Sequence, residues 1–276
     1  ISCSLVGSEM CIRDRQYTLS IRLSTDGFSF SIHHPSRPEE GCCQRYPVNT
    51  QRSMAANIKA FLNDTPILKK PFGQTNILVH NQRYTSIPFE LFEDEQAETL
   101  FYQNLPKQNN EIILCNILGH SNLAVLFSID KLTHLFLSEQ FPGARFFSAV
   151  SPQIEYIVSR HKAPHANRIY ANLHPGSMDI FCFRENRLQL LNSFATSTLN
   201  DRCYYLLNLW KQLKYNQEED EMYLTCAEYP VEEIKEILSS YIRKIMIINP
   251  QAELGNLQFT KGESIPFDMQ TLLTCV

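Results

Sequence analysis

Two pairs of histidines have the residue type that binds metal ions. His33 and His34 are adjacent, and neighbouring residues of a strand point to opposite faces, so this pair cannot chelate one ion. His161 and His165 are four residues apart, but Pro164 between them opposes the helix that would place both rings on one face. We interpret the first pair as exposed strand-end residues and the second as part of a polar loop, and we predict no metal site.

Two other groups of side chains have structural explanations. The acidic run at 218–221 precedes a predicted strand and is typical of a solvated turn. Tyr204, Tyr205 and Trp210 could stack on bases, but at helical spacing beside leucines they indicate the core and its margin. The sequence contains no Gly-x-Ser-x-Gly motif and no phosphate-binding P-loop, so we name no catalytic residue. An enzyme is therefore the less favoured interpretation.

The composition is that of an ordinary globular protein. The chain has 276 residues, 43% of them hydrophobic, and 25 Lys and Arg against 29 Asp and Glu give a net charge of −4. This length allows one large or two small domains. A mildly acidic chain has no field that attracts phosphate backbones, so we expect no direct contact with nucleic acid. No apolar run is long enough for a membrane span, and nine scattered cysteines without a C-x-x-C motif favour the cytoplasm.

The first residues resemble a translated sequencing adapter rather than a natural protein segment. The resemblance lies in the stretch from Leu5 to Asp14. We therefore interpret residues 1–15 as an artefact and exclude them from arguments about the fold, with a natural N-terminal tail as the alternative. Deleting them should leave the melting temperature unchanged.

The clearest local element is a β-hairpin over residues 17–33. Alternating apolar residues flank Asp26-Gly27, a dipeptide typical of two-residue turns. With this turn, Leu23 faces Phe30 and Ile21 faces Ile32. Further along, the pattern predicts a strand at 42–48, a helix from 49, a strand at 76–80, a helix at 88–105, a hairpin of 111–118 and 122–128, a helix at 130–140, a strand at 144–147 and a helix from 151.

The second half of the chain repeats the order of the first. After a polar, proline-containing linker at 161–167, we predict strands at 168–174, 177–183 and 187–194, a helix from 200, a strand at 222–226, a helix at 231–241 and a strand at 244–248. The spacing from first strand to first helix is about the same in both halves, from 17 to 51 and from 168 to 200. The sequence thus predicts an α/β protein with duplicated βββαβαβ halves, 16–160 and 168–276. Two unrelated α/β halves are the alternative.

Several stretches of the sequence resemble a known family. They are Ser20–Ile32, Ile87–Phe92, Tyr204–Leu213 and Ile265–Leu273. They are similar to an uncharacterised bacterial family, domain of unknown function 3822. The order of elements in the two halves resembles the superfamily of actin, the heat-shock chaperone ATPases and the sugar kinases. The resemblance implies an actin-like ATPase (ribonuclease H-like) fold and a cytoplasmic protein without an assigned activity.

The superfamily resemblance also implies candidate nucleotide-binding residues. In that superfamily the first hairpin turn of each half presents an Asp, a Gly and a Ser or Thr to phosphate and metal. The matching candidate cofactor-binding residues here are Asp26, Gly27, Gly176 and Ser177. The match is incomplete, because Phe28 follows the first turn, His174 replaces the acid of the second, and the late Gly-Gly loop that clasps adenosine is absent.

These departures favour a chain that has lost catalysis. We predict a non-catalytic interaction or assembly module with an unknown protein partner and no cofactor. The alternative is a Mg-ATP-binding ATPase or kinase, with Asp26 on the metal and the backbones of Gly27 and Gly176 on phosphate. An accessory role in RNA processing is a third alternative, which the net negative charge weakens.

Overall fold

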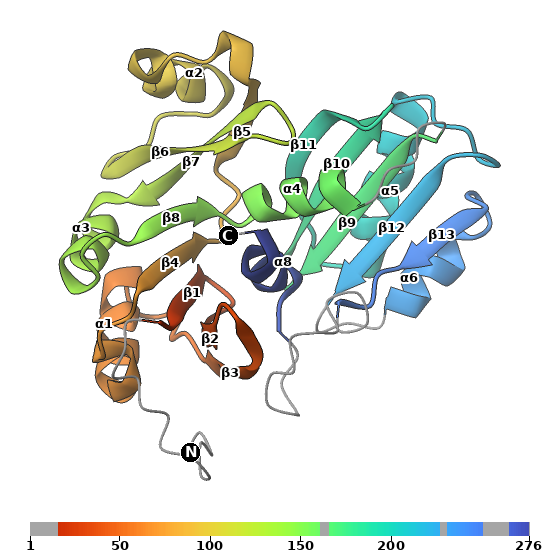
Figure 1. Ribbon diagram of the computed structural model, residues 1–276. Helices are drawn as coiled ribbons and strands as arrows, with labels where there is room; N and C mark the ends of the chain where they lie inside the picture. Colours follow the sequence, from red (N-terminus) through yellow and green to blue (C-terminus); the bar gives the residue numbers. More distant parts are fainter. Residues whose placement is uncertain (1–15, 161–165, 227–230, 251–264, 276) are drawn as a thin grey trace.

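The first half is built on a five-stranded mixed sheet. The computed structural model describes residues 16–160, 166–226, 231–250 and 265–275 (Figure 1), so residues 1–15 and most of the predicted linker lie outside the described part. Along the sheet the strands are β3 (Arg37–Tyr46), β2 (Gly27–His34), β1 (Thr18–Ser24), β4 (Gln74–Val79) and β8 (Arg145–Ser148). The first three are antiparallel neighbours, whereas β4 runs parallel to both β1 and β8.

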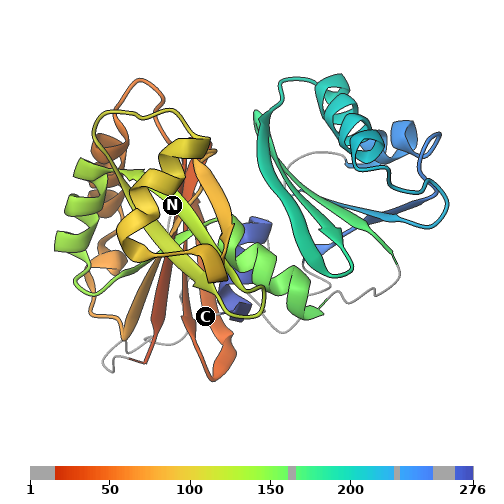
Figure 2. The ribbon, with the colours of Figure 1, turned by 90° about the horizontal axis from the view of Figure 1, so that it is seen from above.

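The second half repeats this sheet. Its strands, in spatial order, are β11 (Arg187–Ala195), β10 (Ser177–Arg184), β9 (Arg168–His174), β12 (Glu221–Cys226) and β13 (Lys244–Ile247). As in the first sheet, the initial three strands pair antiparallel and the last two extend the sheet in parallel. The predicted duplication of the α/β unit is therefore confirmed, and Figure 2 shows the two halves side by side.

The helices also follow the predicted order. They are α1 (Met54–Asp64), α3 (Lys131–Gln140) and α4 (Val150–Arg160) in the first half, and α5 (Leu199–Gln212) and α6 (Val231–Leu238) in the second. Three of them begin where a polar side chain satisfies free backbone amides: Ser53 caps α1, Asp130 caps α3, and Thr198 forms a capping box with Asp201 at α5. The helix after the first hairpin thus starts at Met54, several residues later than the sequence predicted.

A three-stranded sheet is inserted between β4 and β8. It contains β5 (Tyr84–Pro88), β7 (Leu123–Asp130) and β6 (Glu111–Leu118), with α2 (Ala97–Asn104) beside it. Short 3-10 turns lie at η1 (Pro66–Lys69), η2 (Phe89–Leu91) and η3 (Asp94–Gln96). The predicted helix at 88–105 is therefore wrong over its first half. Pairing of β5 with β7 buries Tyr84 and Ile87, and this burial outweighs the local helical pattern that begins at Pro88.

The first hairpin differs from its prediction by two residues in register. Ser24 pairs with Gly27, so Thr25 and Asp26 form the loop, and Leu23 lies opposite Phe28 rather than Phe30. Gly27 has a φ of 150°, a conformation that glycine adopts freely, and a Cβ there would lie 3.5 Å from the carbonyl oxygen of Tyr46. A shift of two residues keeps every side chain on its predicted face, which is why the hydrophobic pattern did not reveal it.

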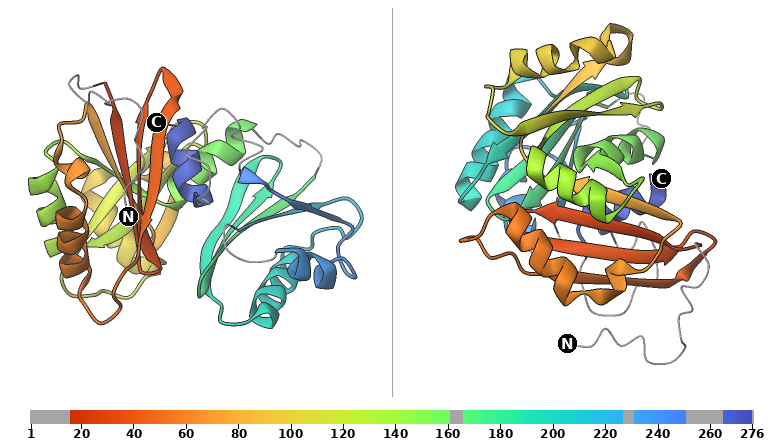
Figure 3. Two further views of the ribbon diagram at one scale, coloured as in Figure 1. Left: turned by 90° about the horizontal axis from the view of Figure 1, so that it is seen from below. Right: turned by 90° about the vertical axis from the view of Figure 1, so that its left-hand side faces the viewer.

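The last helix of the described chain returns to the first half. Helix α8 (Phe267–Cys275) lies beside α4 and near β1, between the two sheets (Figures 2 and 3). Its Leu272 packs with Leu78 and Ala149, and its Met269 packs with Cys43. The sequence did not predict this helix. The division into 16–160 and 168–276 stays a prediction, and the packing of α8 shows that the end of the chain contacts the first half.

The hydrophobic core also connects the halves. One cluster of buried residues runs from β1, β2 and α1 to Tyr170, Phe181 and Phe183 of the second sheet. A second cluster lies between the second sheet and helices α5 and α6, and it includes Trp210. The apolar contact across the halves fixes the position of the polar residues between them.

Candidate functional site

A cavity of about 250 Å³ lies between the two halves, next to both hairpin turns. Asp26 and Gly27 line it from the first half, and His174 and Pro175 line it from the second. Gly176 has a φ of 78°, as a tight turn between β9 and β10 requires, and Ser177 is buried at the start of β10. Of the four predicted cofactor-binding residues, the cavity thus brings together Asp26 and Gly27, whereas neither Gly176 nor Ser177 is among its lining residues.

Asp26 is paired with a cation from its own strand. Arg22 Nη1 lies 3.3 Å from Asp26 Oδ1, and Arg22 Nε donates to Asp268 Oδ2 of α8 at 2.7 Å. Burial alone would raise the pKa of Asp26, but Arg22, the Ser24 hydroxyl and the nearby His80 and His174 together lower it. The carboxylate of the first turn is therefore ionised and already compensated by charges of the protein.

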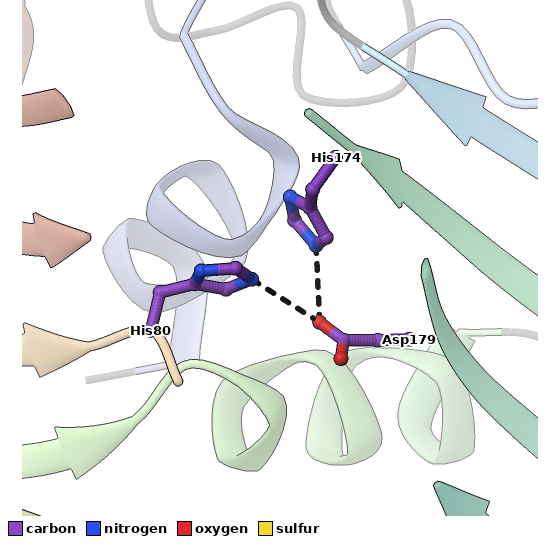
Figure 4. A group of neighbouring side chains, drawn as sticks. All are labelled: His80, His174 and Asp179. Carbon is purple, nitrogen blue, oxygen red and sulfur yellow. Dashed lines mark hydrogen bonds and ion pairs between the residues drawn. The ribbon is translucent and has the colours of Figure 1, made fainter. Parts of the chain in front are cut away.

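A buried cluster of two histidines and one aspartate crosses the boundary between the halves (Figure 4). His80 follows β4, His174 ends β9 and Asp179 lies on β10. His174 Nε2 is 3.0 Å from Asp179 Oδ2, and His80 Nε2 is 3.5 Å from the same oxygen. The two imidazole rings have their centres 4.1 Å apart. One carboxylate oxygen thus faces both rings.

The other oxygen of Asp179 binds a tyrosine of the first half. Tyr84 donates its hydroxyl proton to Asp179 Oδ1 at 2.9 Å. Burial would raise the pKa of Asp179, but the hydrogen bond from His174 and the closeness of the His80 ring hold it far below its usual range. The pKa of His80 is lowered by burial, by His174 and by Arg22. The resulting cluster contains an ionised carboxylate beside a neutral His80.

The sequence analysis identified His174 at the second turn but did not predict the side chains that contact it. It predicted a second turn without an acid, whereas Asp179 supplies a carboxylate five residues later. Ser177 pairs with His174 and Asn172 pairs with Asp179 in the β9–β10 ladder, so His174 and Asp179 are diagonal neighbours on one face. The predicted hairpin of 168–174 and 177–183 therefore already implied that these two side chains are close. No local pattern indicates His80 or Tyr84, because their contacts with Asp179 depend on the packing of the halves.

Several side chains that the sequence analysis did not assign to a site lie in surroundings other than those predicted. His33 is buried rather than exposed, because β2 is covered along its length, and burial lowers its pKa to about 4. Within the acidic run, Asp220 is buried and accepts hydrogen bonds from the amides of Asn167 and Asn216, so only part of the run is solvated. Trp210 lies in the second core cluster as predicted, whereas Tyr204 is 62% exposed.

None of the described helices has the length and apolar character needed to cross a bilayer.

The sequence and the fold both match known proteins. Residues 10–245 match the family described as protein of unknown function (DUF3822). The chain belongs to this family. A crystal structure from Bacteroides thetaiotaomicron, described as a protein with actin-like ATPase fold and unknown function, is 41% identical to this DUF3822 chain, with a TM-score of 0.86 over 98% of this chain and 100% of that one. A search of curated proteins found no match.

A more distant structure supports the same fold. The PilM-PilN type IV pilus biogenesis complex contains a chain that is 9% identical to this DUF3822 protein, with a TM-score of 0.59 over 94% of this chain and 98% of that one. At this identity the likeness concerns the fold alone. The predicted family and the predicted actin-like ATPase fold are both confirmed.

Proposed function

We propose that this DUF3822 protein is a non-catalytic interaction or assembly module that has an actin-like fold and binds a protein partner. The observation that carries the proposal is the pairing of Asp26 with Arg22, which Asp268 of α8 holds in place. A cation bound by Asp26 would meet the guanidinium group 3.3 Å from the same carboxylate. Like charges at this separation repel, so the first turn is a poor binding site for Mg²⁺.

The second turn has His174 where the superfamily has the acid, and Mg²⁺ prefers oxygen ligands to an imidazole nitrogen. The nearby carboxylate of Asp179 faces His174 and His80 with one oxygen and accepts the Tyr84 hydroxyl with the other. Gly176, whose backbone the ATPase alternative places on phosphate, does not line the cavity with Asp26, and neither does Ser177. The second turn lines it through His174 and Pro175 instead, and Pro175 has no backbone N–H to donate to a phosphate.

The size of the cavity supports the same conclusion. Ligand pockets usually have volumes of roughly 300–1,000 Å³. The cavity between the halves has about 250 Å³, which is small for a nucleoside triphosphate with its metal ion. Phe267 and Pro266 of the C-terminal segment form part of its wall.

An interaction role is compatible with other uses of the fold. The PilM-PilN structure is that of a complex, so a chain of this fold occurs in a protein assembly. This protein also exposes large apolar side chains on short elements, among them Phe89 and Leu91 on η2 and Leu132 and Leu135 on α3. Such residues are common in protein interfaces. Partner identity would come from crosslinking and affinity purification in the native host.

Calorimetric titration with Mg-ATP and with Mg-ADP tests the proposal. We expect no saturable heat with either nucleotide, and we expect Asp26→Ala to leave partner binding intact. Asp94→Ala, which removes a carboxylate from the η3 turn of the inserted segment, is the matched control. Micromolar binding of Mg-ATP that Asp26→Ala abolishes and Asp94→Ala preserves would refute the proposal and support the ATPase or kinase alternative.

A further inference from the structure

We propose that His80, His174 and Asp179 bind one divalent transition-metal ion of the Zn²⁺ class between the two halves of the protein. This inference concerns a site different from the Asp26 turn, and it stands whether or not the interaction role is correct. It rests on the geometry of three ligand atoms, on one unpartnered nitrogen and on the local charge.

Two of the three separations between the ligand atoms are close to those of a tetrahedral ion. Each residue offers one donor atom, and the three atoms all lie within 4.8 Å of one another. Zn²⁺ binds nitrogen and carboxylate oxygen at about 2.0–2.1 Å, so two ligands of a tetrahedral ion are about 3.3 Å apart. The two nitrogen–oxygen separations at Asp179 are 3.0 and 3.5 Å. Small side-chain movements would therefore complete the ligand set.

The nitrogen of His80 that faces the cluster makes no hydrogen bond. The His80 side chain is 8% exposed, and its Nε2 is buried without a hydrogen-bond partner. Its Nδ1 lies 3.0 Å from Ser24 Oγ, which also accepts a hydrogen bond from the backbone amide of Asp26 at 3.4 Å. Ser24 therefore holds the ring from its far side and leaves Nε2 turned toward Asp179.

The buried Nε2 of His80 and Oδ2 of Asp179 lie 3.5 Å apart, and Nε2 has no hydrogen-bond partner there. A cation bound by both atoms would satisfy them. Neutral imidazole nitrogens and a carboxylate are ligands that Zn²⁺ and similar first-row ions accept, whereas Mg²⁺ and Ca²⁺ prefer oxygen alone.

The charge around the cluster also favours a cation. The buried carboxylates of Asp179 and Asp268 and the more exposed carboxylate of Asp26 lie around the cluster, with the guanidinium groups of Arg22 and Arg202 near them. Both arginines already have partners. Arg22 binds the two other aspartates, and Arg202 donates to the backbone oxygen of His174 and to Thr196. Neither one compensates Asp179 directly.

The candidate ligands are held by further hydrogen bonds, as metal ligands usually are. Ser24 orients the His80 ring, Tyr84 holds the second oxygen of Asp179, and Arg202 fixes the backbone at His174. Because His80 belongs to the first half and the other two ligands belong to the second, an ion here would tie the halves together. It would stabilise the arrangement of the three side chains that Figure 4 shows.

Metal titration of the chelator-treated full chain tests the site. With Zn²⁺ as the probe, we expect one ion bound per chain and a rise in melting temperature, and with Co²⁺ a visible spectrum typical of tetrahedral nitrogen and oxygen ligands. We expect His80→Ala to weaken Zn²⁺ binding about 100-fold and to abolish both the melting shift and the Co²⁺ spectrum. Mg²⁺ should bind to neither protein at this site.

A second pair of variants separates the site from folding defects and from surface binding. Asp179→Asn keeps the size of the side chain, and should lose the same signals while its circular dichroism stays that of a folded protein. His120→Ala is the matched control, because His120 forms an exposed pair with Glu155 at 2.7 Å. It should bind Zn²⁺ as the wild type does. Absence of stoichiometric Zn²⁺ binding, or binding that persists in both His80→Ala and Asp179→Asn, would overturn the proposal.

Discussion

Arg22 and Asp268 are 246 positions apart in the chain, yet their side chains form a buried ion pair with 2.7 Å between Nε and Oδ2. Burial alone would lower the pKa of Arg22, but Asp268 and Asp26 raise it above its usual value. The pair connects β1, the first strand of the fold, with α8, the last helix. It also holds the guanidinium group that compensates Asp26, so the end of the chain determines the charge of the cavity.

Breaking this pair should strongly destabilise the protein. Asp268→Ala leaves a buried guanidinium with one carboxylate partner fewer, and losing one partner of a buried pair usually costs about 3–5 kcal/mol. Urea denaturation monitored by circular dichroism measures the free energy of unfolding. Glu218→Ala removes the partner of Arg243 in an exposed pair and should leave that free energy almost unchanged. Equal effects of the two substitutions would contradict the role assigned to Asp268.

The apolar face of α8 should contribute through packing. Met269 is completely buried against Cys43, and Met269→Ala should lower the free energy of unfolding by about 2–5 kcal/mol, the range for large-to-small core substitutions. Leu135→Ala is the control, because Leu135 on α3 is 55% exposed. Leu135→Ala should lower the free energy of unfolding much less. If both variants unfold at the same urea concentration, α8 does not dock as described.

Stability should fall as the pH drops below about 6.5, in part because of His33. Burial lowers the pKa of His33 to about 4, so between about pH 6.5 and 4 the unfolded chain binds a proton that the folded chain does not. Stability from this residue is present above pH 6.5 and is lost as the pH falls, with a limit of about 3 kcal/mol. Denaturation curves across this range should show a smaller loss for His33→Gln than for the wild type.

The exposed His120 provides the control for this pH dependence. His120→Gln replaces a histidine whose side chain is 73% exposed, so it controls for the substitution itself. A His33→Gln curve that runs parallel to the wild-type curve between pH 6.5 and 4 would show that His33 titrates normally in the folded protein.

Local patterns predicted the strands and most helices, but not contacts between distant segments. Alternation along β1 and β2 placed Leu19 and Ile21 correctly on one face, since that signal needs only neighbouring residues. The two-residue shift in the hairpin left every side chain on its predicted face, so the alternation could not reveal it. Helix α8 is buried on nearly all sides, so it has no polar face and no helical period for the sequence to reveal.

The candidate site was predictable only in part for the same reason. The position of Asp26 in a turn followed from its neighbours, and the pairing of His174 with Asp179 was implied by the β9–β10 register. His80 reaches Asp179 only after the two halves pack together. The sequence indicates the hairpin turn of each half separately. The charge balance of the cavity, in contrast, depends on side chains from both halves and from α8.

The hydrogen bond between Tyr84 and Asp179 should contribute to the docking of the two halves. Tyr84→Phe removes the hydroxyl donor and leaves a buried carboxylate oxygen without that partner, which should cost about 1–3 kcal/mol of stability. The control Tyr46→Phe removes a hydroxyl bound to exposed Asp64 and should have a smaller effect, because water can replace the donor. Hydrogen exchange should locate the loss: amides of β5 and β10 should exchange faster in Tyr84→Phe. Unchanged exchange in both strands would show that the halves dock without this bond.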